Sequence, residues 1–96
     1  MTYQVIWSEG AAQELTKLDR SIARRILDHV EGLRTNPRRG LRRLVGVPYY
    51  RLRVGDYRVI VELMEDKLLI LVLKVGHRRS IYLSPRLSAR RLLPPS

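Results

Sequence analysis

Apolar residues alternate with polar ones at the start of the chain and then recur at helical spacing. Tyr3, Val5 and Trp7 follow the period of a half-buried strand, which we place at residues 3–7. Ser8 can cap a helix that follows. The apolar positions of this helix share one face: Ala11, Ala12, Leu15 and Leu18.

A second helix is predicted from Asp19 onward. It stops at Asn36-Pro37, because proline cannot continue a helix and restricts the residue before it. Its apolar positions form a single stripe: Ile22, Ala23, Ile26, Leu27, Val30 and Leu33. We therefore expect two helices that pack as a hairpin against a sheet.

The second half of the chain carries the pattern of a sheet. Residues 37–48 form a basic connecting loop, and the runs 49–54, 57–64 and 68–75 are rich in Val, Ile, Leu and Tyr. The breaks between these runs are short enough for an antiparallel meander. The fold class predicted is α+β, with an N-terminal strand, a two-helix hairpin and a three-stranded meander forming one sheet.

The C-terminal end has a different composition. Ser84-Pro85 can cap and start a short helix that carries Leu87, Arg90 and Arg91 and ends at Pro94-Pro95, although the segment can equally be a loose tail. Ninety-six residues leave room for one modest core. We predict one domain over residues 1–83 and a basic tail or short helix over 84–96.

The net charge of the chain and its distribution indicate which kinds of partner it can bind. The chain has 19 Lys and Arg residues against 9 Asp and Glu, a formal net charge of +10. The signs are segregated, because no acidic residue occurs between Arg34 and Arg53 or after Asp66. A basic surface can serve solubility alone, but segregated charge favours a polyanionic partner: RNA, DNA or an acidic protein.

Several classes of protein and site are disfavoured. Without cysteine there is no disulfide framework and no thiolate nucleophile or metal ligand. The N-terminus lacks the pattern of an export signal, and no stretch approaches the roughly 20 apolar residues of a membrane span. We expect a cytoplasmic protein with no membrane association, no cofactor and no metal.

Strand alternation predicts a cationic sheet face. If Leu52 and Val54 point to the core, Arg51 and Arg53 point the other way. The next strands add cations by the same reasoning: Arg58, Lys74 and Arg78. Any one of these arginines could simply be solvated, but the cluster would repel itself unless an anion such as phosphate occupied it.

Cleavage of a phosphodiester without metal needs cationic donors, a proton acceptor and a proton donor. Arginine supplies the donors but is a poor base. His29 is most simply a helix surface residue. His77 is of the residue type best suited to proton transfer near neutral pH, and it could act in catalysis if a bulge or bend at Gly76 turned it toward Arg78. Tyr82 can stack on a base or close the sheet as a half-buried ring.

Together these features resemble the RelE/ParE toxin superfamily from Tyr3 to about Tyr82. The strongest match is the segment from Tyr50 to Ile60, followed by Val75-Gly76-His77-Arg78-Arg79 and then Tyr82. A weaker match is Leu15-Thr16-Lys17-Leu18 in the first helix. The resemblance implies a RelE-like fold and the toxin component of a toxin–antitoxin system.

In RelE-type toxins the activity is that of an mRNA interferase, a ribosome-dependent endoribonuclease. The ribose 2′-hydroxyl of an mRNA in the ribosomal A site attacks its own phosphate. By resemblance, Arg58 stabilises charge on the phosphate, Arg78 is the general acid, and Tyr82 stacks on or orients the nucleotide. Arg51 and Arg53, with Lys74 and Arg79, would bind RNA phosphates.

This sequence departs from the family pattern at the residue proposed to act as the general base. Arg51 and Arg53 fall where RelE has lysines, one of them a proposed base, and arginine practically cannot fill that role. Either His77 is the base, or proton removal is left to water or ribosomal RNA.

Two other functions compete with the nuclease. ParE-like relatives share the fold, lack this set of residues and poison DNA gyrase, so the presence of Arg58, Arg78 and Tyr82 favours the nuclease. The third possibility is a non-catalytic RNA- or ribosome-binding module. The resemblance also implies a cognate antitoxin as partner, beside the 70S-type ribosome and mRNA.

Overall fold

Strand β1 (Gln4–Trp7) opens the chain, and Ser8 then starts helix α1 (Glu9–Thr16) by accepting a hydrogen bond from the backbone N–H of Ala11 at 3.1 Å. The computed structural model describes residues 2–77. Its remaining elements are α2 (Arg20–Gly32), α3 (Pro37–Gly40), β2 (Leu41–Arg43), β3 (Tyr50–Val54), β4 (Tyr57–Met64), a 3₁₀ turn (Glu65–Lys67) and β5 (Leu69–His77).

All five strands form one sheet in the order β1-β5-β4-β3-β2. From β2 to β5 each strand pairs antiparallel with the next one along the chain, so the predicted meander of β3, β4 and β5 is confirmed. The first strand instead pairs in parallel with the last, with Gln4 opposite Leu69 and Trp7 opposite Val72. A tight turn joins β3 to β4, where Gly55 has a φ of 58° that glycine adopts at no steric cost.

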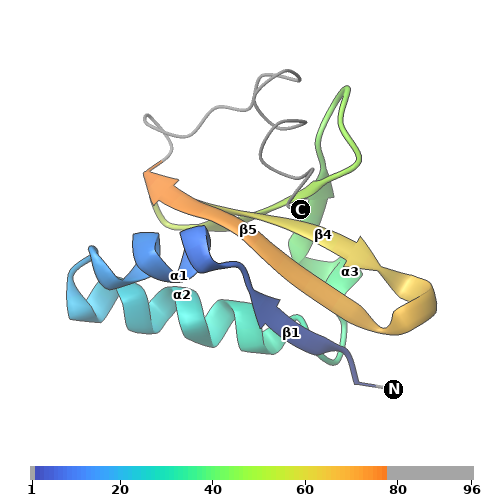
Figure 1. The fold of residues 1–96 in the computed structure, drawn as a ribbon, viewed down its shortest axis with the longest axis horizontal. Helices are drawn as coiled ribbons and strands as arrows, with labels where there is room; N and C mark the ends of the chain where they lie inside the picture. The colour runs from blue at the N-terminus through green and yellow to red at the C-terminus, as the bar shows by residue number, and fades with distance from the viewer. Residues whose placement is uncertain (1, 78–96) are drawn as a thin grey trace.

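Helices α1 and α2 cover one face of the sheet (Figure 1), and within residues 2–77 no helix layer covers the other face, which we call the open face. The predicted stripe of α2 supplies Ile26 and Val30 to the core, and α1 supplies Ala11. The sheet residues that pack on them alternate along the strands: Leu52, Val54, Val59, Val61, Ile70, Val72 and Val75. Residues of the opposite parity, including Arg51, Arg53 and Arg58, therefore lie on the open face.

The predicted α+β class is confirmed, with one correction to residues 37–48. This stretch is not a plain loop, because it contains α3 and the edge strand β2, which pairs with β3 through Leu41 opposite Leu52. Within residues 2–77 the sheet therefore has five strands. No helix within residues 2–77 is long and apolar enough to cross a membrane. The predicted C-terminal helix lies outside the described residues.

A β-bulge interrupts β5. Ile60 is opposite Lys74 and Val61 is opposite Val72, so Leu73 is the extra residue. The bulge allows Val72 and Val75, three positions apart, both to be buried on the helix side. It lies before Gly76, where a catalytic role of His77 would require a bulge or bend, and it sets which face every later residue of the strand occupies.

Candidate functional site

The open face of the sheet carries two pairs of arginines that are directly opposite one another on neighbouring strands. Arg42 on β2 is opposite Arg51 on β3, and Arg53 on β3 is opposite Arg58 on β4. We call these four residues the arginine face. Directly opposed like charges destabilise a sheet, and here two such pairs lie two residues apart along β3.

No carboxylate within residues 2–77 pairs with the arginine face. The ion pairs found in this part of the chain join Arg34 to Glu31, Arg38 to Glu65, and Lys74 to Glu14. Glu62 follows Ile60 on β4, but its charge acts on Tyr49, where it adds to burial in raising the pKa of that phenol. The arginine face is thus cationic and uncompensated by the described residues.

Partial burial makes the positive charges of the arginine face more costly to maintain. Arg51 and Arg58 are half-buried, whereas Arg42 and Arg53 are exposed. Burial lowers the pKa of Arg51, and the charges of Arg58, Arg42 and Arg53 lower it further. The Nε atom of Arg58 is fully buried and has no hydrogen-bond partner among residues 2–77. A buried donor without a partner is costly, so the environment of the Arg58 guanidinium is unfavourable for its charge in the absence of a ligand.

A pocket of about 350 Å³ opens on this face. It is lined by Gly40, Arg42, Arg51 and Arg53. Beside it a small apolar cluster, built on buried Tyr49 and Ile60, packs with Leu44, Val47 and Leu73 and fixes the neighbouring part of the face. Three of the four residues of the arginine face therefore line this hollow, whereas Arg58 is not among its lining residues.

Lys74 differs from the prediction in its environment. Its backbone lies opposite Ile60, in the row that contains Arg42 and Arg51. Its Nζ, however, donates to Oε2 of Glu14 at 2.8 Å, while Oε1 of Glu14 accepts the Val75 backbone N–H at 2.8 Å. The carboxylate of α1 thus neutralises Lys74 at the edge of β5, and phosphate binding by Lys74 would have to compete with this pair.

His77 is not brought beside Arg58. Its neighbour on β4 is Tyr57, and the two rings meet edge to face with centroids 5.4 Å apart and an interplanar angle of 78°. Gly76, not His77, is the residue opposite Arg58. Tyr57 packs against the core on the helix side of the sheet. Because His77 is directly opposite Tyr57, it lies on that same side, away from the arginine face. Arg78, Arg79 and Tyr82 lie outside the described residues.

Arg42 is the residue that sequence reasoning missed. The short run Leu41-Arg42-Arg43 contains a usable signal, because a buried Leu41 implies that Arg42 points to the other face of a strand. Three residues are too few to establish that period without knowledge of the partner strand.

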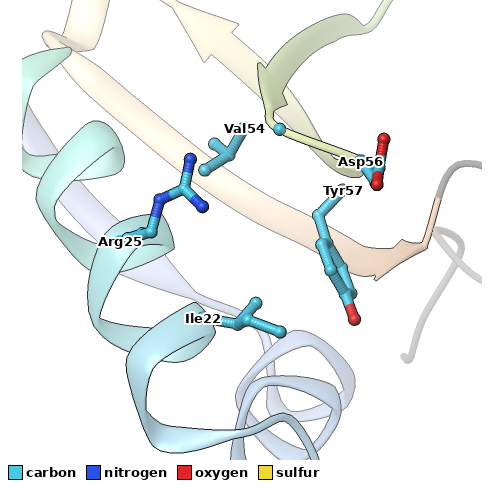
Figure 2. Close-up of a pocket in the computed structure, with 6 residues that line it drawn as sticks. Ile22, Arg25, Val54, Asp56 and Tyr57 are labelled. Atoms are coloured by element: carbon cyan, nitrogen blue, oxygen red, sulfur yellow. The ribbon is translucent and has the colours of Figure 1, made fainter.

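A second pocket, of about 260 Å³, lies on the helix side between α2 and the β3–β4 turn. Figure 2 shows Arg25 reaching from α2 toward Val54, the Tyr57 ring extending toward Ile22, and the Asp56 carboxylate turned away. It holds none of the predicted site residues and only one cation. Residues 2–77 contain no cluster of His, Asp and Glu that could bind a metal ion.

Comparison with known proteins gives the family. A family model described as the ParE toxin of a type II toxin–antitoxin system, parDE, matches residues 5–82. A putative RelE-like toxin protein of Escherichia coli is 30% identical over 81 residues, which cover 81% of this chain and 85% of that protein.

Solved structures agree with this assignment. The RelE–RelB complex of Pyrococcus horikoshii matches with 30% identity and a TM-score of 0.73, over 84% of this chain and 100% of that one. A RelBE toxin–antitoxin complex of Mycobacterium tuberculosis matches with 25% identity and a TM-score of 0.73, over 81% and 93%. A mutant Escherichia coli RelE in the free state shares the fold, with a TM-score of 0.76 at 23% identity over 97% and 100%. The chain therefore belongs to the ParE/RelE family of toxins of type II toxin–antitoxin systems.

Proposed function

We propose that this toxin is a metal-independent endoribonuclease that cleaves mRNA in the ribosomal A site and so inhibits translation. The observation that carries the proposal is the opposed pair Arg53 and Arg58, with the buried Nε of Arg58 left without a partner among residues 2–77. A phosphate between these two guanidiniums would relieve their repulsion by accepting charge-assisted hydrogen bonds from both.

The proposed reaction uses groups of the RNA and the protein, with water or ribosomal RNA to accept the proton of the 2′-hydroxyl. The 2′-oxygen forms a bond to the adjacent phosphorus, and the bond from phosphorus to the 5′-oxygen breaks. The products are a 2′,3′-cyclic phosphate and a 5′-hydroxyl. Arg58 donates hydrogen bonds to the phosphate oxygens as negative charge grows on them, which is where positioned donors accelerate a reaction most. Arg53 holds the same phosphate from the opposite strand.

The remaining roles follow from the resemblance to RelE-type toxins. Arg78 protonates the leaving 5′-oxygen, Tyr82 stacks on the nucleotide, and Arg79 binds a flanking phosphate. Because His77 contacts Tyr57 on the other face, we assign proton removal from the 2′-hydroxyl to water or ribosomal RNA. The base would then come from outside the chain.

The proposal is tested by mapping RNA ends after purified toxin is added to a translated mRNA, with and without ribosomes. Arg58→Ala should lower cleavage about 10²- to 10³-fold, the usual cost of removing one oxyanion donor. Arg24→Ala removes an equivalent, exposed charge on α2 and should cleave like the wild type. His77→Gln should lose less than the roughly 10²-fold expected for a general base.

Inhibition of DNA gyrase is the second candidate function, because the matching family model is described for ParE toxins. ParE-like relatives inhibit DNA gyrase and do not cut RNA. A supercoiling assay in parallel decides between the two, since intact mRNA with inhibited gyrase would replace the nuclease proposal.

We also propose a cognate antitoxin that holds this toxin inactive in the cytoplasm. The matched structures from Pyrococcus horikoshii and Mycobacterium tuberculosis are toxin–antitoxin complexes. A net charge of +10 favours an acidic antitoxin segment, whose attraction would be strongest at low salt. Co-purification with the product of the neighbouring gene tests this partner, and failure to form a complex would count against it.

A further inference from the structure

The second opposed pair, Arg42 and Arg51, is not used by the reaction proposed above. It lies one step along the sheet from Arg53 and Arg58, and the same pocket of about 350 Å³ is lined by Arg42, Arg51 and Arg53. No carboxylate among residues 2–77 is paired with Arg42 or Arg51. A separate anion is needed to account for this pair.

The geometry favours successive phosphates over an isolated anion. Residues two apart on a strand are separated by about 7 Å on the same face. Arg51 and Arg53 have this relation on β3, and each has an arginine directly across from it. The arginine face therefore presents two binding positions in a line, spaced much as neighbouring phosphates are along a nucleic-acid strand.

We infer that Arg42 and Arg51 form a second phosphate subsite, which binds the RNA phosphate next to the one held by Arg53 and Arg58. The inference rests on the proposed nuclease function and adds Arg42 as a positioning residue. By fixing two consecutive phosphates, the sheet sets which phosphate faces Arg58. The contact is to the backbone, so it positions the strand without reading its bases.

The environment of Arg51 is further evidence for an anionic ligand at this subsite. Its guanidinium is half-buried and its pKa is lowered by burial and by Arg58, Arg42 and Arg53. Arginine nevertheless stays charged near neutral pH. The cost of holding this charge is recovered only when an anion enters, and the planar guanidinium fork suits phosphate.

The test uses a short RNA with a 2′-O-methyl group at the cleavable nucleotide, so that it binds but cannot react. Two further oligonucleotides carry an uncharged methylphosphonate at the phosphate on either the 5′ or the 3′ side of the cut. Affinity is measured across a salt series for the wild type, Arg42→Ala and the control Arg24→Ala. Thermal melting verifies that both variants fold.

We expect Arg42→Ala to weaken binding about five- to tenfold and to reduce the salt slope by about 0.7, the value for one phosphate contact in a single strand. One of the two methylphosphonates should weaken the wild type by a similar factor and leave Arg42→Ala unaffected. Arg24→Ala should behave as the wild type with every oligonucleotide.

The inference is overturned if Arg42→Ala binds RNA as tightly as the wild type, or if it remains equally sensitive to both methylphosphonates. Weakened antitoxin binding with unchanged RNA binding would assign the pair to a protein partner and would also overturn it. Because the oligonucleotide cannot be cut, this result is independent of whether the toxin is a nuclease. On ribosomes, the same variant should raise KM while the position of the cut spreads to neighbouring phosphates.

Discussion

Replacing Arg58 with methionine is expected to stabilise the fold and at the same time to remove the proposed activity. Methionine keeps much of the buried aliphatic stem and lacks the guanidinium. The substitution removes one half of the opposed pair with Arg53 and the buried Nε that has no partner within residues 2–77. Both changes lower the free energy of the folded state in the absence of RNA.

The expected gain in the free energy of unfolding follows from the geometry of the opposed pair. Opposed residues have Cα atoms about 5 Å apart, so the two guanidiniums are on the order of 6 Å apart. Their repulsion at an effective dielectric constant of about 40 to 80 is roughly 1 kcal/mol. Removing an unsatisfied buried donor adds about 1 kcal/mol or more. A net gain of about 1–2 kcal/mol should raise Tm by several degrees in a domain of this size.

Thermal melting in a series of phosphate concentrations measures the effect. In low salt the Arg58→Met variant should melt above the wild type. Added phosphate should stabilise the wild type more than the variant, because an anion that binds only the folded state raises its stability by mass action. A variant that melts below the wild type in low salt, or that responds equally to phosphate, would refute the argument that the arginine face is strained without a ligand.

Two further predictions concern other contacts. Glu14→Gln should destabilise the fold by about 1–2 kcal/mol in urea unfolding, because the carboxylate that joins Lys74 and the Val75 N–H is lost; an unchanged midpoint would contradict its role at the β5 edge. Burial, followed by Glu62, raises the pKa of Tyr49 above its unfolded value, so its contribution to stability is complete below about pH 10 and is lost as pH rises through the folded pKa. Tyr49→Phe should flatten this alkaline decline, and a decline of equal slope in both proteins would exclude Tyr49 as its source.

Local patterns predicted most of the fold. The apolar stripe of α2 and the turn at Gly55-Asp56 are encoded within a few residues, so both were predicted from spacing alone. Alternation likewise placed Arg51, Arg53 and Arg58 on one face, and the strand register confirms it.

The features that the sequence did not predict depend on contacts between segments far apart in the chain. Strand β2 exists because Leu41–Arg43 finds β3, and the three residues alone have no readable period. The pair of Glu14 with Lys74 joins positions 60 residues apart. The bulge at Leu73 has no glycine to signal it, yet it decides which side of the sheet His77 occupies. The roles of Arg78, Arg79 and Tyr82 stay predictions.

The parallel pairing of β1 with β5 also bears on how the protein is made. Among the strands of residues 2–77, β1 is synthesised first and its partner β5 last. At the usual 5–20 residues per second, roughly, several seconds separate the two on the translating ribosome. In the finished sheet β5 lies between β1 and β4 (Figure 1), so until β5 is made β1 has no strand to pair with and the core lacks the side chains of β5. A nascent chain therefore cannot acquire the finished sheet until β5 has been translated, and any activity of the toxin that needs the complete sheet is delayed until then.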